Sequence, residues 1–150
     1  MTDTPPRAQL FKYTKPDDSG TKRRHIVWLA RTDRIVANMQ VLKDGGENSL
    51  HSHKHLDGFW MVLGGRCRFY GEGDVVIADL SKHEGIMVPR GFKYWFESVG
   101  EEPLELLQVE AFDVPLKSRQ ELFADRVEYT PRVEKFDDVS ESDGLLEKQQ

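Results

Sequence analysis

The sequence predicts an all-β protein, arranged as an antiparallel sandwich or barrel. Short runs of alternating or β-branched residues follow one another closely between residues 26 and 112, and turn-forming residues fill the gaps between them. No helical stretch interrupts this series. Many short strands separated by turn residues are typical of all-β folds. The length of 150 residues fits a single domain.

Alternation or apolar character assigns eight of these runs to strands. The predicted strands are 26–30, 34–42, 59–63, 66–70, 75–80, 85–88, 93–99 and 104–112. The turns between them are expected at 31–33, 43–48, 64–65, 71–74, 89–91 and 100–103. Of these turns, Gly64-Gly65 is a dipeptide strongly associated with tight hairpins.

The segments that flank this region differ in composition from it. The predicted division is an N-terminal arm (1–24), a barrel domain (25–115), a C-terminal helix with an extension (116–132) and an acidic, flexible tail (133–150). Ser118 and Glu121 have the spacing of a capping box, which predicts a short helix over 116–124.

Composition and charge limit the classes of function. The formal net charge is −5, so no overall charge attracts nucleic acid or an anionic membrane. No apolar stretch approaches the roughly 18 residues that span a bilayer, and the N-terminus lacks the apolar core of a signal peptide. Cys67 is the single cysteine, which fits a reducing compartment. We therefore expect a cytoplasmic protein that acts on a small-molecule substrate and binds neither nucleic acid nor a membrane.

Three histidines, His51, His53 and His55, alternate with other residues in one short run. In an extended strand all three would point to one face, with about 7 Å between the Cα atoms of the first two and about 13 Å between the outer two. Two imidazoles at the shorter spacing can converge on one ion, whereas His55 is too distant unless the strand bends. Asp57 would share their face if the strand continued regularly. Two histidines and a carboxylate are a ligand set for divalent transition metals.

The same residues resemble the first sequence motif of the cupin family, written G-x5-H-x-H-x3,4-E-x6-G. Gly45, His51, His53, Asp57 and Gly64 occupy its fixed positions with every spacing kept. Aspartate takes the place of the glutamate, so the carboxylate is one methylene shorter.

The second cupin motif, G-x5-P-x-G-x2-H-x3-N, aligns on Pro89 and Gly91. Three of its positions differ: His83 stands at the first glycine, Tyr94 at the histidine and Ser98 at the asparagine. The first motif is thus nearly intact, and the second is degenerate.

The resemblance covers residues 34–112 and implies the double-stranded β-helix, or jelly-roll barrel, of cupins. Because cupins are commonly dimeric, it also implies a homodimer. Family members usually hold a divalent metal, so the resemblance implies a site made of His51, His53 and Asp57. Iron is the first expectation, with manganese, nickel and zinc as alternatives. Tyr94 would bind the metal, hydrogen-bond to a water on it, or exchange a proton with the substrate.

Alternation along the strands predicts which other residues face the interior. The residues expected to line the cavity are Gln40, Phe59, Met61, Phe96 and Gln108. The two glutamines belong to this set because a polar side chain within an apolar strand needs a partner when it is buried. Trp60 and Trp95 have the opposite parity and are expected to pack outside the barrel.

Three functions remain open, and the first is the leading hypothesis. It is a metal-dependent enzyme for a small organic substrate, either a dioxygenase or a Lewis-acid lyase or isomerase. The second is a metal-free isomerase, epimerase or dehydratase for a nucleotide-linked sugar, with His51 or His53 as the base and Tyr94 as the acid. The third is a cupin that binds a small ligand without catalysis.

Overall fold

The computed structural model describes residues 5–17, 23–45, 49–118, 121, 124–130 and 139–146, and its secondary structure is almost wholly β. The strands are β1 (Arg24–Arg31), β2 (Ile35–Leu42), β3 (His51–His53), β4 (Leu56–Gly64), β5 (Arg66–Tyr70), β6 (Val76–Leu80), β7 (Gly85–Val88), β8 (Trp95–Val99), β9 (Leu104–Phe112), β10 (Arg126–Glu128) and β11 (Val139–Asp143). A short 3-10 turn, Glu72–Asp74, separates β5 from β6.

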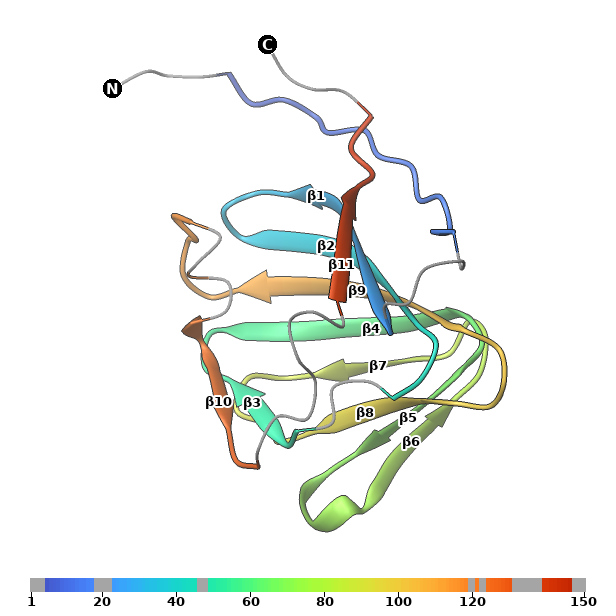
Figure 1. The fold of residues 1–150 in the computed structure, drawn as a ribbon. Coiled ribbons are helices and arrows are strands. Elements are labelled where there is room, and N and C mark those ends of the chain that lie inside the picture. The colour runs from blue at the N-terminus through green and yellow to red at the C-terminus, as the bar shows by residue number, and fades with distance from the viewer. Residues whose placement is uncertain are drawn as a thin grey trace.

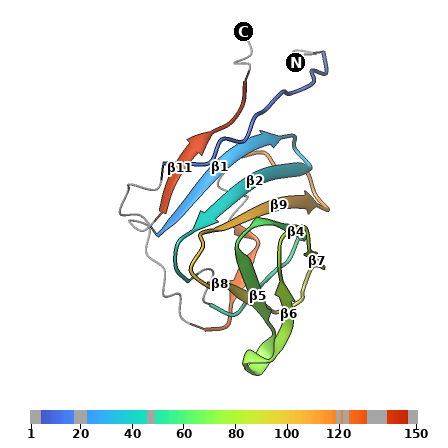
Figure 2. The same ribbon diagram turned by 90° about the vertical axis from the view of Figure 1, so that its right-hand side faces the viewer.

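Three sheets make up the barrel (Figure 1). The large sheet has the order β11-β1-β2-β9-β4-β7, the second has the order β6-β5-β8, and the third pairs β10 with β3. Figure 2 shows β1, β2 and β9 side by side in one wall, with β5, β6 and β8 below them. An isolated bridge between His51 and Tyr94 links β3 to the residue that precedes β8.

The strands predicted from the sequence agree closely with those in the structure. β5, β7 and β9 have the predicted bounds, and the other predicted strands differ by a few residues at their ends. The hairpin between β4 and β5 turns at Gly65, which has a φ of 74°. A Cβ atom at this position would lie 2.6 Å from the carbonyl oxygen of Pro103, so the turn requires glycine.

The helix predicted for 116–124 falls partly outside the described residues. Within them, the backbone N–H of Glu121 donates to Ser118 Oγ at 3.4 Å, as in a capping box. The carboxylate of Glu121 reaches back and accepts from the backbone N–H of Lys117 at 2.5 Å. No helix in the described part of the chain is long and apolar enough to cross a membrane.

Part of the segment expected to be a flexible tail forms a strand. β11 runs parallel to β1 at the edge of the large sheet, with Val139 beside Arg24 and Asp143 beside Trp28. The indole N–H of Trp28 donates to the carboxylate of Glu141 at 3.0 Å. The composition of β11 is polar because an edge strand is stabilised by main-chain hydrogen bonds to its one neighbour and needs little apolar surface of its own. Sequence alternation therefore did not detect it.

A histidine on β1 forms side-chain hydrogen bonds with β11 on the outer face of the sheet. His25 Nδ1 lies 2.5 Å from Ser140 Oγ and His25 Nε2 lies 2.9 Å from Ser142 Oγ. Desolvation lowers the pKa of His25, and the charge of Glu141 offsets part of that effect. The folded protein therefore holds this imidazole neutral at pH values where the unfolded chain already takes up a proton.

We expect acid to weaken the fold through this residue. Because the unfolded chain binds the extra proton, the stabilisation is complete above about pH 6.5 and is lost as the pH falls below that value. His25→Gln should therefore show a smaller drop in melting temperature between pH 7.5 and pH 5.5 than the wild type. His83→Asn, a change at an exposed turn, is the control. An unchanged pH dependence in His25→Gln would contradict the prediction.

The interior is apolar and aromatic at one end of the barrel. Its centre is a set of four rings, Trp60, Phe69, Tyr94 and Phe96. The ring centroids of Trp60 and Phe69 each lie 5.0 to 6.5 Å from those of the other three. Leucine and valine side chains of β2, β4, β7 and β9 surround these rings. Such packing holds the β8 region firmly against the large sheet.

The parity predicted for β4 is wrong. Trp60 is fully buried in the core, whereas Phe59 is 38% exposed on the outer face, together with Met61. The reason is the break at residues 54–55, which separates β3 from β4 and shifts the alternation by one position. Inward residues have odd numbers in β3 and even numbers in β4. Phe59 and Met61 therefore do not line the interior.

Candidate functional site

Two histidines of β3 point into the barrel. His51 is fully buried, and the side chain of His53 is 12% exposed. Their ring centroids are 5.2 Å apart and their planes are nearly perpendicular. The pair lies as the alternation in β3 predicts. Because His53 alone retains contact with the outside, it is the member of the pair that an incoming molecule can reach.

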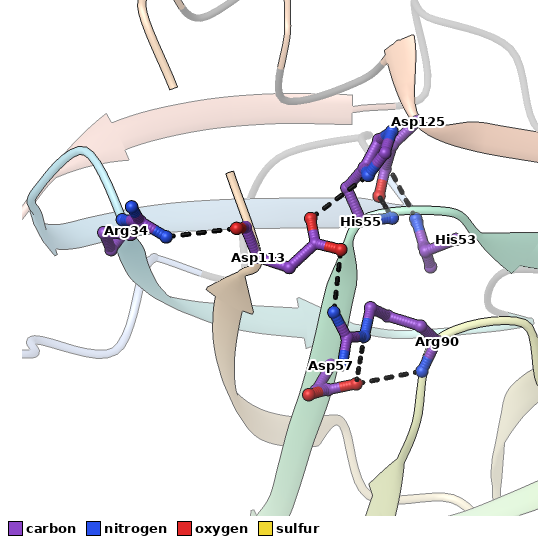
Figure 3. Close-up of polar contacts among 7 residues, drawn as sticks. All are labelled: Arg34, His53, His55, Asp57, Arg90, Asp113 and Asp125. Atoms are coloured by element: carbon purple, nitrogen blue, oxygen red, sulfur yellow. Dashed lines mark hydrogen bonds and ion pairs between the residues drawn. The ribbon is translucent and has the colours of Figure 1, made fainter. Parts of the chain in front are cut away.

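Each of the two rings is held through its Nδ1 atom. His51 Nδ1 lies 2.8 Å from the carbonyl oxygen of Ser49, which can only accept, so Nδ1 carries the proton. His53 Nδ1 lies 3.1 Å from a carboxylate oxygen of Asp125, whose side chain is 3% exposed (Figure 3). In the neutral form of either ring, this contact leaves the basic lone pair on Nε2. This arrangement suits a general base or a metal ligand.

Tyr94 completes an aromatic group with the two histidines. Its backbone exchanges two hydrogen bonds with His51, at 2.9 and 3.1 Å. Its ring centroid lies 4.4 Å from that of His51 and 6.3 Å from that of His53. The side chain is buried. The residue that replaces the second-motif histidine thus lies beside the first-motif pair.

Asp57 does not join this group, which corrects the ligand set inferred from the sequence. It has the outward parity of Phe59, and its carboxylate accepts from the backbone N–H of Arg90 at 2.9 Å. The Arg90 guanidinium adds an ion pair at 3.4 Å (Figure 3). The described residues contain no group of three or more His, Cys, Asp or Glu side chains that could hold a metal ion. The shift of alternation at 54–55 is again the cause.

A charged network ties the strand ends together at the rim of the barrel. Asp113 accepts from Arg90 Nη1 at 2.7 Å and lies 3.1 Å from His55 Nδ1. Its backbone carbonyl accepts from Arg34 (Figure 3). Desolvation alone would raise the pKa of Asp113, but the hydrogen bond from Arg90 and the charges of His55 and Arg90 outweigh it and hold the pKa below its ordinary value. His55 therefore belongs to the rim and not to the interior pair.

β10 and the residue before it supply two further site residues that the sequence analysis did not identify. Asp125 precedes this strand, and Arg126 lies directly opposite His53 in the β3–β10 pair. Arg126 Nη2 donates to Ser49 Oγ at 2.8 Å, and its Nε donates to Glu128 at 2.8 Å. No motif marks these residues in the sequence, because they reach the site only through the pairing of β10 with β3.

The comparisons with known proteins concern this barrel. No family model matches the chain. Mannose-1-phosphate guanylyltransferase of Escherichia coli is 29% identical over 94 residues, which are 63% of this chain and 19% of that protein. The chain spans less than a fifth of the length of the curated relatives it matches.

Solved structures establish the architecture. An uncharacterised protein of Klebsiella pneumoniae with a double-stranded β-helix domain superposes with a TM-score of 0.61 at 18% identity, over 83% of this chain and 100% of that one. A cupin superfamily protein of Desulfitobacterium hafniense gives a TM-score of 0.57 at 19% identity, over 72% of this chain and 100% of that one. The chain has the cupin fold. Pac13 of Streptomyces, described as a nucleoside dehydratase, gives a TM-score of 0.51 at 13% identity, over 67% of this chain and 71–72% of that one.

A row of polar groups crosses the inner face of the large sheet. We call Asn38, Gln40, Gln108 and Trp60 the polar floor. Gln108 Oε1 accepts from Gln40 Nε2 at 2.7 Å and from Asn38 Nδ2 at 3.2 Å. Trp60 lies opposite Gln108 in the β4–β9 pair. The inward positions predicted for Gln40 and Gln108 agree with their burial.

A cavity of about 440 Å³ lies elsewhere in the molecule, at the edge where β11 meets β1. Trp28, Arg31, Val36, Glu141 and Asp143 contribute to its walls. Val36 and Trp28 also pack in a small apolar cluster with Leu56, Phe112 and Leu116. The residues that line this cavity do not include the histidine pair.

Proposed function

We propose that this cupin catalyses proton transfer on a small, sugar-containing substrate, as an isomerase, an epimerase or a dehydratase. His53 is the base, Asp125 is its positioning residue and Tyr94 is the acid. The observation that carries this proposal is the 3.1 Å contact between His53 Nδ1 and the buried carboxylate of Asp125, with the centroid of the Tyr94 ring 6.3 Å from that of His53.

The pairing with Asp125 gives His53 the properties of a base. The carboxylate accepts a hydrogen bond from Nδ1–H, so Nε2 is left to remove a proton from a carbon beside a carbonyl group. The resulting imidazolium is stabilised by the negative charge of Asp125 at 3.1 Å. His51 Nδ1 contacts a neutral carbonyl, which stabilises a positively charged ring less than the carboxylate of Asp125 does.

Tyr94 supplies the second proton transfer. It returns a proton to the same carbon in an epimerisation, or to a neighbouring atom in an isomerisation. In a dehydration the proton goes to a leaving hydroxyl group, the C–O bond breaks, a C=C bond forms and water departs. One proton is taken and one is given in each case, and proton exchange with solvent restores the neutral imidazole and the phenol.

The names of similar proteins support the substrate class. The E. coli relative is named for mannose 1-phosphate, and Pac13 is described as a nucleoside dehydratase whose structure was obtained with uridine. A sugar ring is common to both. The fold similarity alone does not carry the assignment, because one fold serves many reactions.

The metal expected from the cupin resemblance fits this site poorly. The two histidines have the Nδ1 contacts that metal-binding histidines usually show. Among the described residues, no third His, Cys, Asp or Glu side chain joins them in a group that could hold a metal ion. The proposed reaction therefore has no metal-dependent step. Iron, manganese, nickel and zinc belong to the alternative, metal-dependent hypothesis.

Deuterium exchange tests the proposal directly, because it detects removal of a carbon-bound proton whatever the product is. A panel of nucleotide-linked sugars, their keto derivatives and nucleosides is incubated with the enzyme in deuterium oxide and followed by proton NMR. The wild type should exchange one carbon-bound hydrogen in at least one compound. Tyr94→Phe should keep this exchange and lose the net product, because the base still acts when the acid is gone.

Two results would count against the proposal. One is exchange at the wild-type rate in His53→Gln. The other is activity that disappears with EDTA and returns with iron(II) or another divalent metal, which would restore the metal-dependent hypothesis. Phe59→Leu, on the outer face of the neighbouring strand, controls for general damage to the protein.

A further inference from the structure

The polar floor lies next to the candidate catalytic group. The ring of Trp60 lies 6.5 Å from the ring of Tyr94, which in turn contacts His51. Asn38 is 1% exposed, Gln40 is 3% exposed and Trp60 is fully buried. Four polar side chains at such depth need hydrogen-bond partners, because nearly all buried polar groups in native proteins have them.

The amides of the floor satisfy one another only in part. Gln108 Oε1 uses the N–H groups of both Asn38 and Gln40. Within the described part of the chain, neither Asn38 Oδ1 nor Gln40 Oε1 has a hydrogen-bond partner. Turning all three amides end for end would leave two NH2 groups unpaired instead. Either orientation therefore leaves two buried amide ends available to a ligand.

Trp60 adds a third group of the same kind. Its indole N–H is buried and has no hydrogen-bond partner among the described residues. The inward neighbour on β4 is Gly58, where a Cβ atom would lie only 3.3 Å from Trp60 Nε1. Because Gly58 has no side chain, it offers this N–H no side-chain partner on that side. Glu110, also buried, lies opposite Gly58 on β9.

We propose that the polar floor binds the hydroxyl groups of a polyhydroxylated ligand, such as a sugar ring. The ligand must accept a hydrogen bond from Trp60 and pair with the amide ends of Asn38 and Gln40. A hydroxyl group both donates and accepts. An ammonium group cannot accept, and a carboxylate or phosphate cannot donate. This inference rests on the proposed function, since it names the groups that hold a sugar beside His53.

The floor predicts opposite stability effects for the same substitution at two neighbouring glutamines. Gln40→Met removes an unpaired oxygen, and Gln108 still accepts from Asn38, so the melting temperature should rise by about 2–4 °C. Gln108→Met strips two buried N–H groups of their acceptor, so the melting temperature should fall by a similar amount. A polar group kept at a cost in stability is expected where it binds a ligand.

Ligand binding decides between this explanation and a purely structural one. D-mannose, mannose 1-phosphate and uridine are the probes, and binding is measured by NMR titration of the intact chain. At least one probe should bind the wild type, and Gln40→Met should weaken its binding by about tenfold or more. Leu63→Met, on the partly exposed outer side of β4, is the control and should bind normally.

Three outcomes would overturn the inference. They are a lower melting temperature in Gln40→Met than in the wild type, probe binding by Gln40→Met within twofold of that by the wild type, or no binding of any probe to the wild type. The test is separate from that of the proposed function. A probe that binds through Gln40 supports the floor even if no compound of the substrate panel exchanges hydrogen in deuterium oxide, a result that would count against the catalytic proposal alone. If Gln40→Met leaves the rate of hydrogen exchange unchanged, the proposed role of the polar floor is wrong and the catalytic proposal stands.

Discussion

Asp125→Asn should lower the rate of hydrogen exchange and kcat by a factor of about 10²–10⁴, with little change in KM. The carboxylate fixes the Nδ1 proton of His53 and carries the charge that balances the imidazolium, and the amide can do neither reliably. Because the residue acts through His53, its substitution should also alter the tautomer. Nitrogen NMR of the ring should show a protonated Nδ1 in the wild type and a changed proton distribution in the variant.

The rim provides a matched control for this substitution. Asp113 contacts His55 Nδ1 at 3.1 Å, the same distance that separates Asp125 from His53 Nδ1. Asp113→Asn removes a carboxylate from an exposed pair outside the interior and should change kcat by less than about threefold. Equal effects of the two substitutions, or an unchanged tautomer in Asp125→Asn, would show that Asp125 has only a structural role.

Trp60→Ala should lower the free energy of unfolding by about 3–5 kcal/mol, the largest loss expected for a single core substitution here. The indole is fully buried and lies within 6.5 Å of three other aromatic rings. Its removal would open a cavity at the centre of the core. Phe59→Ala, one residue away, should cost less than about 1 kcal/mol because that ring is 38% exposed.

Urea denaturation of the two variants compares the faces of β4 directly. Since a domain of this size has roughly 5–15 kcal/mol of stability, Trp60→Ala is expected to fold but to unfold at a much lower urea concentration. Trp60→Phe, which keeps an aromatic ring, should recover about half of the loss and shows that the effect comes from packing. A larger loss in Phe59→Ala than in Trp60→Ala would mean that the parity of β4 is reversed.

The sequence was informative about the barrel because strand alternation and turn residues are local signals. The runs at 66–70, 85–88 and 104–112 coincide with β5, β7 and β9, and the paired glycines mark the hairpin after β4. In each of these runs, the alternation of apolar and polar residues indicates which face of the strand is buried. Local signals of this kind do not predict β11, because its polar residues form a strand only by pairing with the edge of β1.

The candidate site was predictable in part. His51, His53 and Tyr94 come together because two motifs lie on strands that the fold bridges. Asp57 was assigned by counting through residues 54–55, where the chain leaves one strand and begins another. A break of two residues leaves no recognisable pattern in the sequence. It nevertheless reverses which side chains of β4 face the interior and which face outward.

By itself the sequence determined the fold class, most strands of the barrel up to residue 112 and the inward histidine pair, since each depends on residues close together in the chain. Only the tertiary structure decided what surrounds that pair. Asp125 lies 72 residues beyond His53 in the sequence and reaches it because β10 pairs with β3. Contacts between distant segments depend on strand register, and register is set by the packing of the whole barrel rather than by any one segment.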